Sequence, residues 1–399
     1  MIEPIFITGA GIISPIGVGK EETLASLLSS KTGIGPMRYL TSCHKNLPVG
    51  EVKLSNDEMS HLLGISNEPH MSRTVLLGRI ALREALEQAG IYGHDLRKVH
   101  LISSTTVAGM DRRELFYEQE STCDKYHAMI ATHNCGDCTR MIADPFGPFA
   151  SLSTVSTACS SATNAIIIGA NMIQSGLADM AVVGGAECLS LFHLNGFNSL
   201  MILAQEQCKP FDKNRVGLNL GEGAAYLVME SSRSLESRGH QPLCLLSGYG
   251  NACDAYHQTA SSPDGDGAYA AMAEALQTAG LKPEEIQYIN AHGTGTPNND
   301  ESEGIAIKRL FAPNLPLFSS TKSFTGHTTS ASGAIEAVIC MLAMSQQFVP
   351  VNLNWSTPMD NGIVPVTVLN RQVKLRHILS NAFSFGGNDS SLIFTNIDN

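Results

Sequence analysis

The sequence predicts an α/β protein with layered sheets whose faces are covered by helices, made of two similar halves. Short apolar runs typical of buried strands alternate with helical segments along the chain. The same alternation begins again near residue 243, without obvious sequence repetition between the halves. We therefore divide the chain into residues 1–243 and 244–399. No low-complexity linker separates these parts, so we expect them to pack tightly.

The elements of the first half follow from local patterns. A buried strand at residues 5–8 leads directly into glycines, and Gly90 follows a long helical pattern as a C′ residue does. Residues 111–144 are polar, contain cysteines and lack a regular pattern, so we expect an insertion that covers a site or meets a partner. The other expected elements are strands at 101–104, 152–156 and 180–184, and helices at 21–29, 75–89 and 160–175.

The second half is expected to repeat this architecture. Its apolar runs and helical patterns alternate in the same way, which is typical of sheets covered on both faces. The expected strands are 243–250, 286–291, 317–320, 379–383 and 391–395, and the expected helices are 267–279, 300–310 and 332–346.

Composition limits the classes of function. Only 16% of the residues are charged, below the roughly 25% of typical soluble domains, so much surface is hidden in a large core or a subunit interface. This low fraction favours a dimer. The net charge of −11 and the lack of a basic run argue against nucleic-acid binding. Asn171 and Glu336 interrupt the most apolar runs, so we expect no membrane span.

The ten cysteines form no regular disulfide framework. The N-terminal segment MIEPIFITGAG lacks the charged and apolar regions of a signal peptide, so we expect reduced thiols and a cytoplasmic protein. Cys135 and Cys138 form a CxxC motif with His133 and Cys123 nearby, which leaves a zinc site open as an alternative. No second pair of ligands completes it, so we expect ordinary loop or core cysteines and no metal.

Cys159 is the strongest candidate nucleophile. In STVSTACSSATNAIIIGA, a strand is followed by small residues and then at once by a helix, which places the thiol at a helix N-terminus. Unpaired N–H groups and the helix dipole there favour the thiolate. Small neighbours leave room for a substrate. The alternative is a buried core cysteine, which is equally common on local sequence.

His292 is the first of two histidines delivered by a strand into a loop. It lies in IQYINAHGTGTPNND, where Thr294 and Thr296 add two hydroxyls. A hydrogen-bonded structural histidine is the alternative for this motif taken alone.

His327 is the second such histidine, in SSTKSFTGHTTSASGAIEAV. Lys322 precedes it in an apolar stretch, and a buried lysine needs a partner because an unpaired buried charge is costly. Glu336 on the following helix is the expected partner, and we expect the pair to orient His327.

The C-terminal segment NAFSFGGND places Phe383 and Phe385 before two glycines. A glycine pair lets the backbone approach a ligand closely, and Phe385 could close an apolar channel. A plain turn between two strands is the alternative.

Together these segments make the chain resemble the β-ketoacyl-acyl-carrier-protein synthases of thiolase-like fold, in the synthase I/II branch. The resemblance is nearly end to end and includes the segments ITGAGIISPIG, TACSSA, VVGGAE, CKPFDKNRVGLNLGEGAA, GYGNACDAYH, NAHGTGTPNND, TKSFTGH and SFGGND. It implies a five-layered αβαβα fold. It also implies an acyltransferase that joins an acyl group to a malonyl unit by decarboxylative Claisen condensation, in fatty-acid or polyketide synthesis.

The resemblance assigns a role to each candidate residue. Cys159 corresponds to the acyl-accepting cysteine, and its N–H and that of Phe385 to an oxyanion hole. His292 and His327 correspond to the histidines that bind the malonyl thioester carbonyl and assist decarboxylation. The remaining assignments are Lys322 and Glu336 as supporting charges, Asp300 and Glu303 as a supporting acidic pair, Thr294 and Thr296 as phosphopantetheine contacts, and Phe385 with Phe383 at the gate.

The resemblance also implies partners and substrates. The expected partner is an acyl carrier protein whose phosphopantetheine carries the substrates, and no other cofactor is expected. The expected assembly is a homodimer or a heterodimer with a related chain-length-factor subunit. The variants GLNLGEGAA, TGHTTSASG and SFGGND depart from the wording usual in housekeeping enzymes and are more similar to ketosynthases of aryl-polyene and flexirubin-type pigment clusters.

Four other classes of protein share parts of this sequence pattern. A dehydrogenase is suggested by Gly9 and Gly11 after a strand, but Ser14 and Pro15 replace the rest of the dinucleotide fingerprint. A thiolase would carry a second cysteine near the C-terminal glycines, and an initiating synthase would have asparagine in place of His327. A non-elongating, chain-length-determining subunit would lack Cys159, which this chain keeps.

Overall fold

A mixed sheet connects the two halves of the molecule. The structure is a computed structural model that describes residues 3–66, 68, 70–120 and 125–397. Its strands lie in the order β4-β3-β5-β6-β1-β7-β11-β10-β8-β9, and β2 pairs only with β1. The strands are β1 (Ile5–Ser14), β2 (Gly17–Val18), β3 (His100–Ser104), β4 (Ser151–Val155), β5 (Met180–Glu187), β6 (Gly223–Glu230), β7 (Cys244–Cys253), β8 (Tyr288–Asn290), β9 (Leu317–Ser319), β10 (His377–Ala382) and β11 (Asn388–Thr395).

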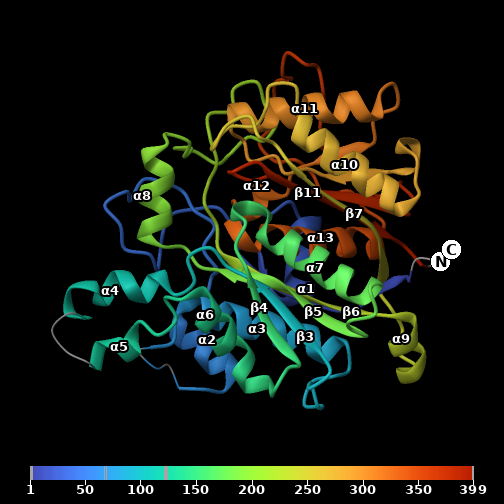
Figure 1. The fold of residues 1–399 in the computed structure, drawn as a ribbon. Helices are drawn as coiled ribbons and strands as arrows, with labels where there is room; N and C mark the ends of the chain where they lie inside the picture. Colours follow the sequence, from blue (N-terminus) through green and yellow to red (C-terminus); the bar gives the residue numbers. More distant parts are fainter. Residues whose placement is uncertain (1–2, 67, 69, 121–124, 398–399) are drawn as a thin grey trace.

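The helices form three layers around these strands. Figure 1 shows α3 and its neighbours below, α7 and α13 in the middle, and α10 and α11 above, so the order is helix, sheet, helix, sheet, helix. The helices are α1 (Gly19–Leu28), α2 (Asn56–Leu63), α3 (Arg73–Gln88), α4 (Met110–Glu120), α5 (Lys125–Met129), α6 (Cys135–Ala143), α7 (Ser161–Gln174), α8 (Leu191–Ser199), α9 (Ser232–Arg238), α10 (Asp266–Ala279), α11 (Pro297–Phe311), α12 (Lys322–Thr325) and α13 (Ser332–Gln346).

The strand order is symmetric about the junction between β1 and β7. On one side β1, β6 and β5 pair antiparallel, and β5, β3 and β4 pair parallel. On the other side β7, β11 and β10 pair antiparallel, and β10, β8 and β9 pair parallel. β7 begins at Cys244, so the division that we propose between residues 243 and 244 lies at this junction.

The symmetry extends to individual contacts between a glycine-containing strand and the helix that covers it. A Cβ atom on Gly9 or Gly11 of β1 would lie 2.3 or 2.0 Å from a carbonyl oxygen of α3. A Cβ atom on Gly248 or Gly250 of β7 would lie 2.3 or 2.2 Å from a carbonyl oxygen of α10. Real Cβ contacts are never this short, so only glycine lets each helix approach its strand so closely.

Each covering helix also accepts a hydrogen bond from its strand, through a glutamate at the equivalent position of the helix. Glu84 of α3 accepts a hydrogen bond from Ile12 N at 2.8 Å, and Glu274 of α10 accepts one from Asn251 N at 2.8 Å. Gly9 and Gly11 therefore lie within a continuous strand, packed on a helix, and do not form a phosphate-binding turn. The dinucleotide interpretation of these glycines is wrong.

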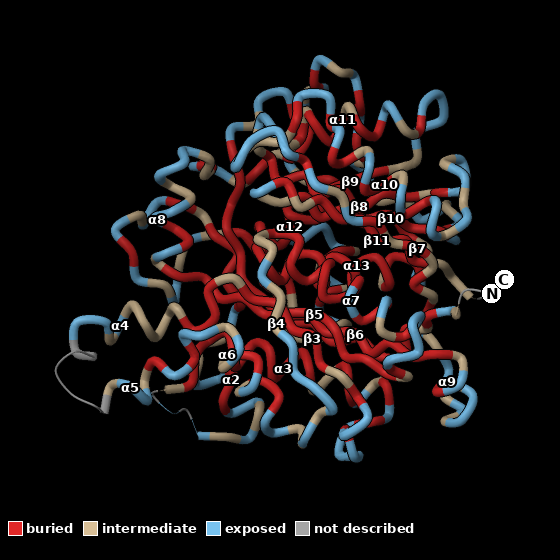
Figure 2. Tube along the Cα trace, in the orientation of Figure 1, coloured by how far each residue is buried: buried red, intermediate tan, exposed pale blue. Residues whose placement is uncertain are grey.

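The middle helices form the most deeply buried layer. Figure 2 shows α7 and α13 as largely buried between the two sets of strands. The two helices contact each other, and a Cβ atom on Gly333 of α13 would lie 2.0 Å from Thr163 Oγ1 of α7. Because both helices begin near this contact, side chains from their N-terminal turns lie together in the interior.

Several predicted elements agree with the structure and others differ for identifiable reasons. The helix expected at 332–346 is α13, and Gly90 follows α3 with φ of +67°, as predicted. The strand expected at 5–8 extends through the glycines to Ser14, because the close approach of α3 keeps them in the sheet. The sequence patterns did not predict α2, α8, α9, α12, β2 or β6.

The segment expected as an irregular insertion is helical where the structure describes it. Residues 110–120 and 125–143 contain α4, α5 and α6. Glu114 of α4 accepts hydrogen bonds from Leu191 N and Phe192 N at the start of α8, so this segment supports a neighbouring helix. No helix among the described residues is long and apolar enough to cross a membrane.

We predict that Gly11→Ala lowers the free energy of unfolding by about 3 kcal/mol or more, because overpacking of a rigid core typically costs about 1–3 kcal/mol and here the clash is with backbone. The control is Gly196→Ala on the exposed face of α8, where a Cβ atom meets nothing within 4 Å. This control should be neutral or stabilising, because alanine is favoured over glycine in helices. Chemical denaturation measures both variants, and equal stabilities would contradict the packing argument.

Candidate active site

Cys159 lies in a sharp turn between β4 and α7. The chain leaves the strand and passes through Ala158, whose φ of +49° is in the left-handed region that side chains larger than glycine rarely adopt. A short 3₁₀ turn, Ala158–Ser160, then leads into α7. The Cys159 side chain is buried, with a relative exposure of 6%. The strained turn therefore directs the thiol into the interior at the start of the helix.

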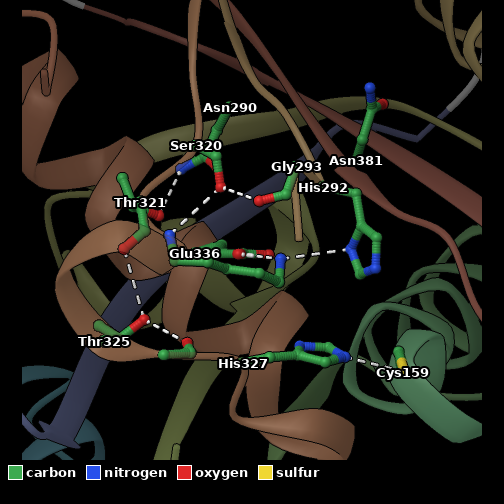
Figure 3. Close-up of polar contacts among 12 residues, drawn as sticks. Cys159, Asn290, His292, Gly293, Ser320, Thr321, Thr325, His327, Glu336 and Asn381 are labelled. Carbon is green, nitrogen blue, oxygen red and sulfur yellow. Dashed lines mark hydrogen bonds and ion pairs between the residues drawn. The ribbon is translucent and has the colours of Figure 1, made fainter. Parts of the chain in front are cut away.

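His327 lies directly against this thiol. It follows α12 and Gly326, and its backbone N–H donates to Asn219 O at 2.7 Å. The ring atom Nε2 is 3.0 Å from Cys159 Sγ, within hydrogen-bonding distance for sulfur, as Figure 3 shows. His327 and Cys159 therefore line one buried pocket.

His292 follows β8 and lies beside His327. The two rings are perpendicular, with centroids 5.3 Å apart. Both histidines have a relative exposure of 2%. Three residues that are distant in sequence are thus held within contact distance, one from the first half of the chain and two from the second.

Lys322 and Glu336 form an ion pair beneath the histidines. Their atoms Nζ and Oε1 are 2.5 Å apart, and both side chains are almost completely buried. Lys322 Nζ is also 3.2 Å from His292 Nδ1. An ammonium group has only donors, so Nδ1 of His292 must accept and the proton is on Nε2. His292 therefore presents an Nε2–H donor to the cavity.

This contact corrects one expectation. The ion pair orients His292, whereas we expected it to orient His327. Within the described parts of the chain, Nδ1 of His327 is buried and has no hydrogen-bond partner. The sequence spacing placed Lys322 closer to His327, but the short helix α12 turns the lysine side chain towards the β8 loop.

Burial controls the protonation of the site. Desolvation raises the pKa of Cys159 to about 11, despite the nearby Lys322 and the backbone N–H groups of Phe385 and Cys159, which lower it. Desolvation and Lys322 also hold the pKa of His292 and His327 well below the usual range. The resting thiol and both imidazoles are therefore neutral at pH 7. Burial outweighs the thiolate preference that we expected from the helix N-terminus.

Glu303 and Asp300 hold the loop that follows His292. Glu303 accepts hydrogen bonds from His292 N and Gly293 N, both at 2.8 Å, and from Asn381 Nδ2 at 3.0 Å. Asp300 accepts one from Gly295 N at 3.1 Å. The backbone N–H groups of this turn donate to the two carboxylates instead of to peptide oxygens. Glu303 and Asp300 therefore support the loop and do not contact the thiol.

A cavity of about 310 Å³ opens onto Cys159 and both histidines. Thr294 and Thr296 line it, and their hydroxyl oxygens are 2.9 Å apart. Phe383 packs with its ring centroid 6.0 Å from that of His292. The predicted substrate-binding residues therefore lie around one cavity.

Phe385 and Phe197 also line this cavity. The ring of Phe385 stacks on that of Phe197 of α8, with centroids 6.0 Å apart and planes inclined by 22°. The ring centroid of His193, one turn earlier in α8, is 6.2 Å from that of Phe197. Neither of these α8 residues was predictable, because a short segment of mixed polar and aromatic residues carries no periodic signal.

A polar network joins the nucleophile turn to the Phe385 loop. Asn388 Oδ1 accepts hydrogen bonds from Ser160 Oγ at 2.7 Å, Asn164 Nδ2 at 2.6 Å and Asn251 Nδ2 at 3.1 Å. Ser160 Oγ is also 3.1 Å from Ser384 Oγ. The network includes residues from α7, β7 and β11, so only tertiary structure brings it together.

The CxxC motif lies in the first turn of α6, away from this site. Cys138 is buried and Cys135 is partly exposed. The described residues contain no group of three or more metal-ligating side chains, and Cys123 lies outside the described residues.

Comparisons with known proteins identify the family. The beta-ketoacyl synthase N-terminal domain matches residues 2–234, and the C-terminal domain matches residues 243–356. A 3-oxoacyl-[acyl-carrier-protein] synthase 2 of Synechocystis sp. is 33% identical, covering 98% of this chain and 97% of the relative. The synthase of the same name from Staphylococcus aureus strain N315 is 32% identical, with 98% and 97% covered.

Solved structures of similar proteins support the same family assignment. The ishigamide ketosynthase/chain length factor has a TM-score of 0.92 and 30% identity, covering 99% of this chain and 100% of that chain. The ketosynthase ApeO in complex with its chain length factor ApeC from Xenorhabdus doucetiae has a TM-score of 0.83 and 31% identity, covering 99% and 98%. The chain belongs to the beta-ketoacyl synthase family of condensing acyltransferases and has the layered thiolase-like fold.

We predict that Lys322→Met lowers the free energy of unfolding by about 3–5 kcal/mol, because it leaves the Glu336 carboxylate buried without its partner. The double variant Lys322→Met/Glu336→Leu should be more stable than Lys322→Met, since it leaves no buried charge. Chemical denaturation of both variants tests this order. A double variant less stable than Lys322→Met would contradict the prediction, because Glu336 would then make favourable interactions with groups other than Lys322.

Proposed function

We propose that this chain is a β-ketoacyl-acyl-carrier-protein synthase, which extends a carrier-bound acyl chain by decarboxylative Claisen condensation. The contact that carries this proposal is the 3.0 Å separation of Cys159 Sγ and His327 Nε2, beside the fixed Nε2–H donor of His292. A nucleophile, a proton acceptor and a second donor meet at one cavity, which is the minimum for acyl transfer followed by enolate formation.

The first step is transfer of the acyl group to Cys159. The thiol proton passes to His327 Nε2 as sulfur attacks the thioester carbonyl, and the N–H groups of Phe385 and Cys159 stabilise the oxyanion. The carbon–sulfur bond to the carrier then breaks, the carrier thiolate takes a proton from solvent, and the proton from Cys159 stays on His327 Nε2. A neutral resting thiol with a pKa of about 11 makes this proton acceptor necessary.

The second step uses both histidines as donors to the malonyl thioester. Loss of carbon dioxide transfers its bonding electrons to the thioester, and the resulting enolate oxygen accepts hydrogen bonds from the two Nε2–H groups. The enolate carbon attacks the acyl carbonyl on Cys159, and the carbon–sulfur bond breaks. The Cys159 thiolate released in this step recovers its proton from His327 Nε2. His292 is held ready for this role by Lys322, with Glu336 balancing the charge.

The proposed partner is an acyl carrier protein. Its phosphopantetheine would enter the 310 Å³ cavity, where Thr294 and Thr296 offer hydroxyl groups to its amides. The proposed chemistry uses no other cofactor, and no metal. The nine described cysteines are free thiols, which supports a reducing, cytoplasmic location.

The proposed assembly is a dimer, either of identical chains or with a chain-length-factor subunit. Two structural relatives, those of the ishigamide and ApeO systems, are described together with such a factor. The alternative that this chain is itself the non-elongating subunit is less well supported, because it retains Cys159 in contact with His327.

The proposed substrate is a specialised chain, unsaturated or aryl-primed, in addition to saturated chains. One wall of the cavity is aromatic, with Phe385 stacked on Phe197. The hydroxyl groups of Thr294 and Thr296 line another part of the same cavity. Flat conjugated chains stack well on aromatic rings and tolerate polar contacts better than flexible saturated chains do.

We predict that Cys159→Ala abolishes acyl transfer and condensation but leaves decarboxylation of malonyl-carrier protein measurable. His292→Ala and His327→Ala should each slow decarboxylation by about a hundredfold or more, since each removes one oxyanion donor. Intact mass reports acylation, and carbon dioxide release reports decarboxylation. Turnover retained by Cys159→Ala would refute the nucleophile assignment.

We predict that polyenoyl or aryl-primed carrier substrates compete successfully with saturated ones. The measurement is kcat/KM for each substrate in a mixed assay, with Phe197→Leu as the variant that removes the stacking surface. This variant should reduce the preference by about three- to tenfold, as expected for loss of about 0.5–1.5 kcal/mol of aromatic contact. Equal or higher kcat/KM for saturated chains in the unmodified enzyme would favour ordinary fatty-acid elongation.

A further inference from the structure

Two buried carboxylates lie at the base of the Phe385 loop. Asp389 follows this loop at the start of β11, and Asp254 follows β7. Their relative exposures are 2% and 7%. A Cβ atom placed on Gly267, in the first turn of α10, would be 2.4 Å from Asp389 Oδ2 and 2.5 Å from Asp254 Cβ. Both side chains therefore border the same space over this glycine.

Both residues hold the loop directly. Ser384 N, the residue before Phe385, donates to Asp389 Oδ1 at 3.3 Å. Asp254 N donates to Gly387 O at 2.7 Å. The carboxylate of Asp254 accepts hydrogen bonds from Tyr256 N at 3.1 Å and Ser262 N at 2.8 Å, which folds residues 254–262 over the same cavity. The pair thus joins the two segments that border Phe385.

Within the described part of the chain, no cationic side chain is paired with either carboxylate. Neither aspartate has an ion pair with a described lysine, arginine or histidine side chain. From α11 the buried Glu303 faces Asp389, and from α10 the exposed Asp266 pairs with Arg309 at 2.7 Å. The other titratable groups on this side are Cys253 of β7, His257 of the adjacent loop, and the neutral His292 and His327 across the cavity.

We propose that Asp389 keeps a proton, which it donates to the Asp254 carboxylate, and that the two act as positioning residues that hold the Phe385 loop against residues 254–262. Two negative charges close together in a buried site repel each other strongly. The proton on Asp389 converts this repulsion into a hydrogen bond between the two segments. Burial and the neighbouring Asp254 raise the pKa of Asp389 to about 7, which agrees with the geometry.

The proton couples the loop to pH. The carboxyl pKa of Asp389 is raised in the folded chain, so its protonated form is retained up to about pH 7 and is lost above it. Loss of the proton leaves two adjacent negative charges, and the loop that carries Phe385 N–H then moves away from Cys159. Acyl transfer should therefore slow as pH rises above about 7. A reaction controlled by ionisation of the Cys159 thiol would accelerate over the same range, because that pKa is about 11.

Two measurements test the pair, and only one depends on the proposed function. The first is single-turnover acylation of Cys159 by an acyl-carrier protein, followed by intact mass between about pH 6 and about pH 8.5. The second is hydrogen exchange of the loop amides of Phe385, Gly386 and Gly387, corrected for the intrinsic pH dependence. The second measurement remains informative if no acyl transfer is detected.

The decisive variant is Asp389→Asn, whose amide donates a hydrogen bond to Asp254 at every pH. In the unmodified enzyme, acylation should be at least about fivefold slower at the upper pH than at the lower one, since the protonated fraction falls about tenfold per unit above the pKa. Loop exchange should rise over the same range. Asp389→Asn should remove both changes, as should Asp254→Asn. The matched control is Asp266→Asn, which alters an exposed carboxylate in the helix turn that contains Gly267. This variant should keep both pH-dependent changes.

Each outcome decides the proposal. Loop exchange that is independent of pH in the unmodified enzyme would overturn it, as would a pH decline that persists in both Asp→Asn variants. Persistence in these variants would assign the titration to Glu303, whose burial raises its pKa to about 7. If Asp389→Asn does not fold, Asp254→Asn and the exchange profile of the unmodified enzyme still distinguish the two results.

Discussion

The ion pair between Lys322 and Glu336 constrains most of the site. A fully buried lysine is tolerated only while its carboxylate partner is in contact, so α12 and α13 must keep a fixed separation. α13 lies between the two sets of strands, and α12 connects β9 to the His327 turn. The same ammonium group fixes the tautomer of His292. One electrostatic requirement thus links the central helix, a sheet edge and the imidazole of His292.

Burial determines how the site performs its chemistry. The dipole at a helix N-terminus stabilises a charge by about 0.3–1 kcal/mol, whereas the rise in the Cys159 pKa corresponds to about 3 kcal/mol in the opposite direction. Desolvation therefore dominates, and the thiol is neutral at rest. A neutral thiol and two neutral imidazoles favour short proton transfers between atoms already in contact. The same low dielectric strengthens hydrogen bonds to an oxyanion once it forms.

Much of the site could be predicted from sequence because its residues lie at strand ends. Cys159, His292 and His327 each follow an apolar strand and precede a helix, a pattern that local sequence reveals. The partner of Lys322 was also predictable, since a buried lysine in an apolar stretch requires a carboxylate. Which histidine the pair contacts was not, because α12 turns the lysine away from its sequence neighbour. Phe197 and the Asp254–Asp389 pair were missed for a related reason: their contacts join segments that are far apart in the chain.

The two halves use the same turn for different purposes. Ala158 and Thr329 both have φ near +50°, each opens a 3₁₀ turn, and each turn leads into a central helix, α7 or α13. The following residue is Cys159 in the first half and Ser330 in the second, and the two turns contact each other.

Because symmetry places these turns together, a nucleophile is needed from only one of them. The second turn is then free to carry His327, two residues before Thr329, to the thiol. The buried hydroxyls of Thr329 and Ser330 have no hydrogen-bond partner among the described residues, so this turn is less completely bonded than its counterpart. Repetition of one supersecondary unit thus explains how residues from opposite halves of the chain meet in a single buried site.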